Sequence, residues 1–250
     1  MAIHLQSVTL HPDRYPTTDH YPFDLAVLRE TTSVSLETPV TMFVGENGAG
    51  KSTLLAAIAR RCGIHIWQDP ARRRFEHNHW EERLGDYISV HWANGNVPGS
   101  FFGSDSFRDF TMILDEWAAA DPGQLRHFGG RSLVTQSHGQ SIMAFFRARY
   151  RLEGLYLLDE PETALSPRTQ LQLLELLVRM SEAGHAQFIL ATHSPILLAC
   201  PGATLYSFDT APLSRVEYAD TEHYRVYRDF MAAPDRFLPG SAGGANGGTP

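Results

Sequence analysis

The sequence contains little cysteine, no long apolar run and no basic leader. Two cysteines in 250 residues, Cys62 and Cys200, make no disulfide framework, and they favour a reducing compartment. No stretch reaches the roughly 18 continuous apolar residues that a membrane-spanning helix needs. The first residues also lack the basic-then-apolar pattern of a secretory signal. We therefore expect a cytoplasmic protein, with any membrane role supplied by a partner.

Positive charge is also scarce. Lys and Arg total 21 against 28 Asp and Glu, which gives a formal net charge of −7 and disfavours strong nonspecific binding to nucleic acid. The short basic cluster at residues 72–74 is typical of a solvated face, and a phosphate or partner contact is the alternative. His77 and His79 have no nearby cysteines or acids, which favours structural roles over a metal or nuclease site.

The apolar pattern alternates between strand-like and helix-like segments. Strands are predicted at residues 2–10, 34–45, 86–92, 154–160, 186–194, 201–209 and 214–219. Helices are predicted at residues 51–63, 69–84, 107–120, 140–152, 166–184 and 222–234. Residues 94–106 are predicted to be a loop, and the glycine-rich residues 239–250 a disordered tail. This order predicts an α/β fold with a mainly parallel sheet and helices on both faces.

The most specific motif is GENGAGKST at residues 45–53, which matches G-x-x-x-x-G-K-[ST] between an apolar strand and a helix. Glycines let successive backbone N–H groups turn inward at a helix N-terminus, whose dipole favours an anion. Lys51 is expected to bind the β- and γ-phosphates, Ser52 to ligate Mg²⁺ and Thr53 to reach the α-phosphate. A chance match is the alternative. The assigned nucleotide-binding residues are Gly45, Glu46, Asn47, Gly48, Ala49, Gly50, Lys51, Ser52 and Thr53.

A second motif, LYLLDEPET, places Asp159 and Glu160 at the end of a buried strand. Neighbouring side chains on a strand point to opposite faces, so both can serve one site only where the strand ends. Asp159 is expected to hold Mg²⁺, and Glu160 to align and deprotonate the attacking water. A helix cap or surface turn is the alternative, but it leaves the preceding apolar run unexplained.

A third strand, in ILATHSPILL, ends at His193. A lone histidine here is most simply a hydrogen-bonded residue at a strand end. Beside the two motifs above, its imidazole is instead expected to donate a hydrogen bond to the γ-phosphate.

The segment TQSHGQSIM lies upstream of the Asp-Glu strand and carries Ser137, Gly139 and Gln140. It resembles the LSGGQ signature of ATP-binding-cassette ATPases, with Gln136 and His138 as departures. An ordinary helix cap is the alternative. The resemblance covers roughly residues 40–205.

The resemblance implies a P-loop fold with a mainly parallel sheet, an antiparallel β edge and a small helical lobe over about residues 64–150. It implies one ATPase domain over residues 1–238, with ATP and Mg²⁺ as cofactors. It also implies an ATP-dependent homodimer in which Ser137, Gly139 and Gln140 complete the nucleotide site of the other subunit. Glu160, His193 and Lys51 are then the catalytic residues, and Ser52 and Asp159 the metal ligands.

Some family positions have no clear counterpart. The Mg²⁺-contacting glutamine is missing; Gln68 lies too early, and Asp105 is a candidate substitute. The adenine-stacking aromatic has three candidates that are equally suited to core packing, namely Tyr15, Tyr21 and Phe23. Ser166 stands where the family usually has Asp.

Two features resemble the stand-alone branch, which includes RecF, the chromosome-structure ATPases, the overcoming-lysogenization nucleases and short bacterial AAA family ATPases. They are the Ser-Pro after His193 and Glu162 in place of the Thr more frequent in transporters. We therefore expect an Mg²⁺-dependent ATPase that dimerises around ATP and drives a conformational change in a DNA-repair, defence or other partner, with DNA or an effector protein as candidate partners. A slow nucleotide switch and a transporter subunit with a membrane partner are the alternatives.

Overall fold

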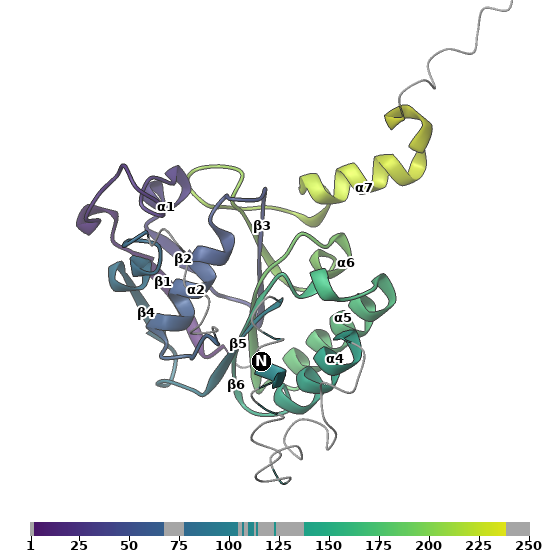
Figure 1. The fold of residues 1–250 in the computed structure, drawn as a ribbon, viewed down its shortest axis with the longest axis horizontal. Coiled ribbons are helices and arrows are strands. Elements are labelled where there is room, and N and C mark those ends of the chain that lie inside the picture. The colour runs from purple at the N-terminus through teal and green to yellow at the C-terminus, as the bar shows by residue number, and fades with distance from the viewer. Residues whose placement is uncertain are drawn as a thin grey trace, which may run out of the picture.

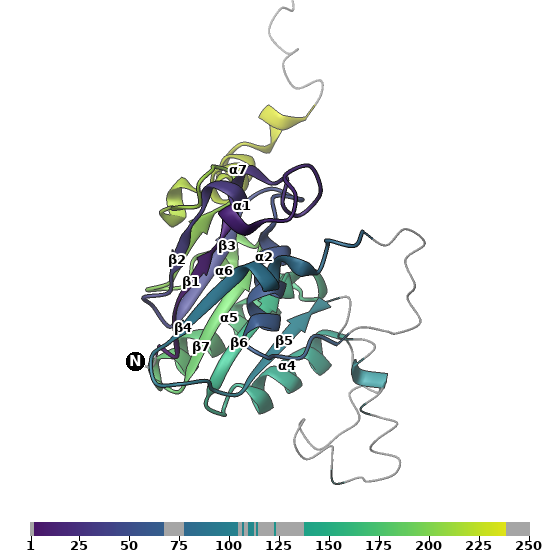
Figure 2. The same cartoon turned by 90° about the vertical axis from the view of Figure 1, so that its left-hand side faces the viewer.

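The computed structural model of this chain describes residues 3–67, 78–104, 107, 110–112, 114, 123 and 138–238. Two sheets and two groups of helices form the body (Figure 1). The central sheet separates α2 and the smaller sheet on one side from α4, α5 and α6 on the other, as the turned view also shows (Figure 2). The expected α/β class, with helices on both faces of the sheet, is confirmed.

The central sheet has the strand order β5-β6-β7-β3-β8-β9. These strands are β3 (Val40–Val44), β5 (Gly99–Gly103), β6 (Gly154–Asp159), β7 (Ala186–Ala191), β8 (Thr204–Ser207) and β9 (Ser214–Arg215). All neighbouring pairs are parallel except β8 with β9. Parallel strands end at the same edge of a sheet, so the residues that follow β3, β6 and β7 are brought together.

A three-stranded antiparallel sheet with order β2-β1-β4 packs over α2. Its strands are β1 (Leu5–Leu10), β2 (Ser33–Ser35) and β4 (Ile88–Trp92). The single strand expected over residues 34–45 is therefore wrong, because β2 and β3 belong to different sheets. Pro39 lies between them and has no N–H to continue a strand ladder.

Gln187 joins the two sheets through a fully buried side chain on β7. Its Oε1 accepts hydrogen bonds from the backbone N–H groups of His4 and Leu5 at 2.9 and 2.8 Å. Its Nε2 donates to the Leu5 carbonyl at 2.8 Å. One amide thus satisfies three backbone groups at the start of β1.

Apolar residues cover both faces of the central sheet. The α-helices with fully described bounds are α1 (Ala26–Glu30), α2 (Lys51–Arg61), α4 (His138–Arg149), α5 (Pro167–Glu182), α6 (Pro195–Leu198) and α7 (Glu222–Ala232). The 3-10 helices are η1 (Pro12–Arg14), η2 (Arg83–Tyr87), η4 (Pro161–Ala164), η5 (Tyr218–Asp220) and η6 (Pro234–Phe237). On α5, the expected N-cap Ser166 accepts a hydrogen bond from the Thr169 N–H.

Two local expectations between β3 and α4 are wrong. The loop expected at residues 94–106 contains β5, whose approach to β6 is so close that a Cβ on Gly99 would lie 2.5 Å from the Leu155 carbonyl oxygen. The glycines that allow this approach also made the segment resemble a loop. The helix expected at residues 69–84 is replaced in its described part, residues 78–84, by turns and the start of η2.

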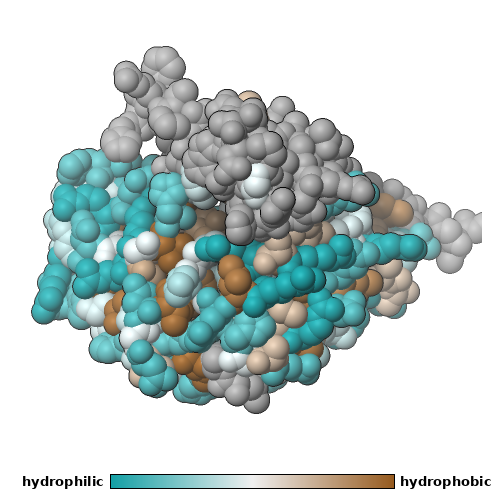
Figure 3. Space-filling model, turned by 90° about the horizontal axis from the view of Figure 1, so that it is seen from below, coloured by the Kyte–Doolittle hydropathy of each residue, from teal (hydrophilic) through white to brown (hydrophobic). Residues whose placement is uncertain are grey.

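The face seen from below in Figure 3 is mostly hydrophilic, with hydrophobic residues in separate patches. Such a mixture is ordinary for a folded protein surface. Among the described residues, no helix is both long enough and apolar enough to cross a membrane.

Candidate nucleotide site

The phosphate loop runs from the end of β3 into the first turn of α2. Its backbone favours glycine at three positions: Gly45 has φ 147°, Gly48 has φ 80° and Gly50 has φ 103°. A Cβ on Gly45 would lie 2.8 Å from Asp209 Oδ1, and one on Gly50 would lie 2.8 Å from Leu25 Cδ1. These conformations place the loop at the positive end of an 11-residue helix, where the helix dipole favours an anion such as phosphate.

Lys51 is buried at the centre of this loop, with only 4% of its surface exposed. Its Nζ donates to the backbone carbonyls of Gly45 at 2.6 Å and Glu46 at 2.8 Å. Burial lowers the pKa of Lys51, and the carboxylates of Glu160 and Asp209 oppose that shift. The two loop carbonyls thus hold the ammonium group at the loop, where a phosphate could replace them as the acceptor.

Asp209 is a site residue that the sequence reasoning did not identify. It follows β8, and its Oδ1 accepts the Glu46 N–H at 2.8 Å, which holds the loop from the side. The available signal was its position, because β8 lies beside β3 and ends at the same edge of the sheet. A carboxylate after a buried parallel strand has the same pattern as Asp159.

The structure brings Ser52 and Asp159 together, although they lie far apart in the sequence. Ser52 Oγ donates to Asp159 Oδ1 at 2.7 Å. Burial raises the pKa of Asp159 to about 6, against the lowering effect of the Ser52 hydrogen bond. A hydroxyl and a carboxylate next to a phosphate loop are the oxygen ligands that suit Mg²⁺.

Glu160 turns away from β6 in a left-handed conformation, with φ 44°. Ser104, directly after β5, donates from its hydroxyl to the Glu160 carbonyl at 2.7 Å. Ser104 lies in the segment where a substitute for the missing glutamine was sought. In the described part of that segment, it is therefore Ser104 that contacts the end of the Asp-Glu strand.

His193 lies close to Glu160, with 3.5 Å between His193 Nε2 and Glu160 Oε1. Its backbone N–H donates to Glu162 Oε1 at 2.5 Å, and its Nδ1 is 2.8 Å from Nε2 of His223. Burial raises the pKa of Glu162, and the hydrogen bond from the His193 backbone opposes this. The sequence reasoning used Glu162 only to choose a branch of the family and did not identify His223.

The signature segment is described only in part. Gly139 and Gln140 lie in the first turn of α4, and a Cβ on Gly139 would lie 3.6 Å from the Ala164 carbonyl oxygen. Ser137, Gln68, Asp105, His77 and the basic cluster at residues 72–74 lie outside the described residues.

Of His77 and His79, His79 lies within the described residues, and its contacts are those of a structural residue. The ring of His79 packs edge-on against Trp80 at 4.9 Å between centroids. Over the described ranges, no three His, Cys, Asp or Glu residues gather as a metal site would require.

The three aromatic candidates for adenine stacking have different surroundings. Phe23 is fully buried and packs 4.8 Å from the Tyr15 ring, so it cannot stack on a base. The Tyr15 hydroxyl donates to the Leu28 carbonyl within the same cluster. Tyr21 is half-buried, and its hydroxyl is hydrogen-bonded to the Thr53 hydroxyl. Tyr21 is thus the candidate that lies next to the phosphate loop.

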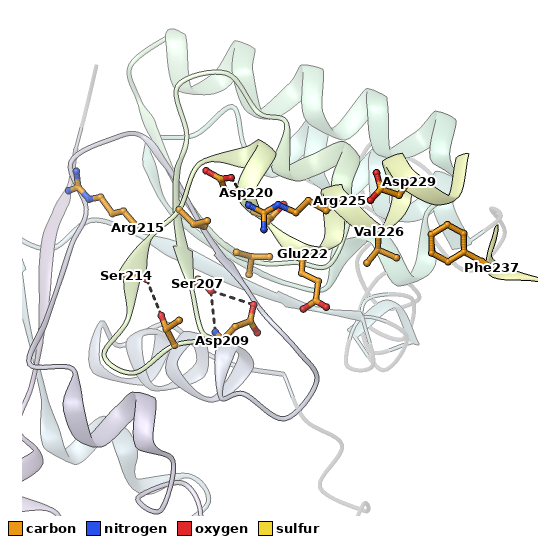
Figure 4. Close-up of a pocket in the computed structure, with 14 residues that line it drawn as sticks. Ser207, Asp209, Ser214, Arg215, Asp220, Glu222, Arg225, Val226, Asp229 and Phe237 are labelled. Carbon is orange, nitrogen blue, oxygen red and sulfur yellow. Dashed lines mark hydrogen bonds and ion pairs between the residues drawn. The ribbon is translucent and has the colours of Figure 1, made fainter. Parts of the chain in front are cut away.

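A hollow of about 560 Å³ lies beside the loop, between β8, β9 and α7 (Figure 4). Four carboxylates and two guanidinium groups line it, namely Asp209, Asp220, Glu222, Asp229, Arg215 and Arg225. Arg225 is paired with Asp220 at 2.5 Å. The excess of carboxylates disfavours a triphosphate here, so the loop at the head of α2 stays the candidate phosphate site.

Two segments of the chain match family profiles. Residues 130–199 match an AAA domain described as putative AbiEii toxin, Type IV TA system, and residues 23–63 match a second AAA domain. Together these segments hold the phosphate loop, the signature segment, the Asp-Glu strand and His193.

Curated relatives include two import ATP-binding proteins. The hemin import ATP-binding protein HmuV of Bradyrhizobium diazoefficiens is 31% identical over 169 residues, which are 57% of this chain and 59% of HmuV. The probable siderophore transport system ATP-binding protein YusV of Bacillus subtilis is 24% identical over 71% of this chain and 69% of YusV. This chain thus spans about three fifths to two thirds of the length of these relatives.

Solved structures share the fold. The SMC head domain from Thermotoga maritima aligns over 86% of this chain and all of its own, with TM-score 0.50 and 17% identity. CbiO1 from Clostridium perfringens, part of the ABC transporter complex cbiONQ, aligns over 93% of this chain and 97% of its own, with TM-score 0.51 and 18% identity. The loop geometry, the strand order and these likenesses support a P-loop fold similar to that of ATPases of the ATP-binding-cassette type.

Proposed function

We propose that this chain hydrolyses Mg-ATP as a homodimer with ATP at the subunit interface, and that hydrolysis drives a conformational change in a partner protein or DNA complex. The observation that carries the proposal is the 2.7 Å contact between Ser52 and Asp159 at the head of α2. It joins the phosphate loop to the end of the Asp-Glu strand at one point.

Different groups of the chain bind the phosphates, hold the metal and accept the proton. The loop N–H groups and Lys51 bind the phosphates, because a buried ammonium and a helix N-terminus both stabilise negative charge. Ser52 and Asp159 would hold Mg²⁺, which neutralises charge on the phosphate oxygens when bound. Glu160 accepts the proton of the attacking water, and His193 donates a hydrogen bond to the γ-phosphate.

The dimer follows from the family resemblance of the signature. Gly139 and Gln140 lie in the first turn of α4, and Ser137 precedes them in the sequence. In this type of ATPase the equivalent residues act on the nucleotide of a second subunit. We propose the same arrangement here. Hydrolysis would then require association, because one copy holds only part of each site.

For the partner, we favour a DNA-repair or defence role. The preference rests on Glu162, which stands where transporters more often have Thr. Its carboxylate accepts a hydrogen bond from the His193 backbone N–H, so this departure from the transporter pattern contacts the strand end that carries His193. The second candidate, a transporter subunit with a membrane partner, is favoured by the import functions in the names of HmuV and YusV.

The test is steady-state phosphate release from the full chain. Wild type is expected to turn over with Mg²⁺, whereas Lys51→Ala and Glu160→Gln should each lose about a hundredfold or more in rate. Glu160→Gln should retain ATP and elute as a dimer on gel filtration with Mg-ATP. Glu175→Gln is the matched control, because Glu175 is exposed on α5 and should change neither property.

Three outcomes would change the assignment. A single round of ATP trapping by wild type, without steady release, would favour a nucleotide switch. A Glu160→Gln protein that stays monomeric at saturating Mg-ATP would contradict the homodimer. Recovery of the native protein with a membrane protein, and no rate increase with single- or double-stranded DNA, would favour the transporter subunit.

A further inference from the structure

The proposed mechanism uses only one side of the His193 ring. Nε2 faces Glu160 Oε1 at 3.5 Å, while Nδ1 is 2.8 Å from Nε2 of His223. Nε2 of His193 is buried and makes no hydrogen bond to any described residue, so it is the nitrogen left for a phosphate. The partner on the other side comes from α7, near the far end of the chain.

The hydrogen on each ring can be assigned from these contacts. At 3.5 Å the Glu160 carboxylate makes no hydrogen bond to Nε2, but its negative charge favours an N–H over a lone pair on the ring nitrogen that faces it. Burial and the charge of Lys51 lower the pKa of His193, which favours a neutral ring with a single N–H. Nδ1 of His193 is then an acceptor, and Nε2 of His223 is the donor to it.

We propose that His223 is a positioning residue that holds His193 in its Nε2–H form, with that N–H directed at the γ-phosphate. In the other neutral form, Nε2 would direct a lone pair at the phosphate oxygens, which repel it. The inference rests on the proposed ATPase function for its effect on rate. The tautomer itself is a property of the protein without nucleotide.

The location of His223 makes the inference testable without damage to the core. It is the second residue of α7, and no residue of that helix is buried. The N-cap Thr221 accepts the Tyr224 N–H through its hydroxyl and holds the first turn in place. Figure 1 shows α7 leading away from the body beyond α6. Loss of the imidazole therefore removes the contact to His193 and little packing.

The experiment replaces His223 in the full chain. His223→Leu should lower kcat about tenfold, the size of effect seen when the partner of a functional histidine is lost, with a smaller change in KM for ATP. His223→Gln should recover part of the rate, because an amide N–H can also donate to Nδ1. Arg225→Ala is the control, since it removes an exposed ion pair from the same helix and should leave kcat unchanged.

Two further measurements separate positioning from a merely structural role. In a His193→Ala background, His223→Leu should change kcat by less than about twofold, because coupled residues are not additive. Nitrogen-15 NMR of histidine-labelled protein should show His193 protonated at Nε2 in the wild type, with a shift toward Nδ1–H in His223→Leu.

The inference is overturned if His223→Leu leaves the His193 tautomer unchanged, or if it slows the His193→Ala protein as much as the wild type. A wild type with no ATPase activity would defeat the proposed function alone, since the NMR measurement needs no turnover.

Discussion

Lys51 is the residue on which the proposed phosphate site depends, and it is the only lysine in the 250-residue sequence. In the protein without nucleotide, its ammonium occupies the loop by donating to two loop carbonyls. A bound phosphate would offer charged acceptors in place of these neutral ones, and hydrogen bonds to charged groups are the stronger kind.

The single lysine gives a direct chemical footprint of the site. Acylation with an amine-reactive reagent can modify only Lys51 and the N-terminal amine, and mass spectrometry separates the two. Mg-ATP at 100 times its Kd should slow the Lys51 reaction about a hundredfold, because only the ligand-free fraction reacts. The N-terminal amine is the internal control and should keep its rate. Equal Lys51 rates with and without Mg-ATP would contradict phosphate binding at this loop.

At the scale of elements, Gln187 controls how the small sheet is attached to the central one. The buried amide satisfies two backbone N–H groups and one carbonyl at the start of β1. An apolar replacement leaves these groups unsatisfied in the interior, which costs about 1–3 kcal/mol for each group that water cannot reach.

We predict that Gln187→Leu lowers the free energy of unfolding by about 3 kcal/mol, measured by urea denaturation. Gln172→Leu is the matched control, because Gln172 is exposed on α5 and the change there should stay within about 0.5 kcal/mol. A loss below about 1 kcal/mol for Gln187→Leu would show that water or local movement replaces the amide.

Elements with a strong local pattern could be predicted from the sequence, and those defined by distant contacts could not. The phosphate loop, α2, α5 and the buried strands β6 and β7 each carry periodicity and end signals within a short window. Strand β5 does not, because two glycines bound it and its identity comes from pairing with β6.

The same distinction holds at the candidate site. Asp159, Glu160 and His193 could be identified because each follows an apolar strand. Asp209 also follows an apolar strand, β8, but it belongs to none of the motifs on which the sequence analysis was based. His223 gave no local signal, since its contact with His193 depends on how α7 leaves η5.

For the whole molecule, we propose a single ATPase domain over residues 1–238, with the lobe at about residues 64–150 as part of it and residues 239–250 outside it. The two cysteines lie on opposite faces of the central sheet, Cys62 on the α2 side and Cys200 on the α4 to α6 side. Burial raises the pKa of Cys62 to about 12 and that of Cys200 to about 11.

Both thiols should therefore be inert to a disulfide reagent in the native protein, because the thiolate is the reactive form. With increasing urea they should become reactive over the same concentration range, as expected for one cooperative unit. Separate labelling midpoints for Cys62 and Cys200 would show that the two faces unfold independently, and would contradict the single domain. Fully denatured protein, in which both thiols react at once, is the control.

We propose that distant stretches of the chain converge on one triphosphate, with one further stretch supplied by a second copy. A crystal structure of the Glu160→Gln protein with Mg-ATP tests it most directly. We expect phosphates at Lys51, the metal between Ser52 and Asp159, His193 at the γ-phosphate and Ser137 from the other subunit on the same nucleotide. A nucleotide bound elsewhere, or at this loop without Asp159 and His193 near its phosphates, would contradict it.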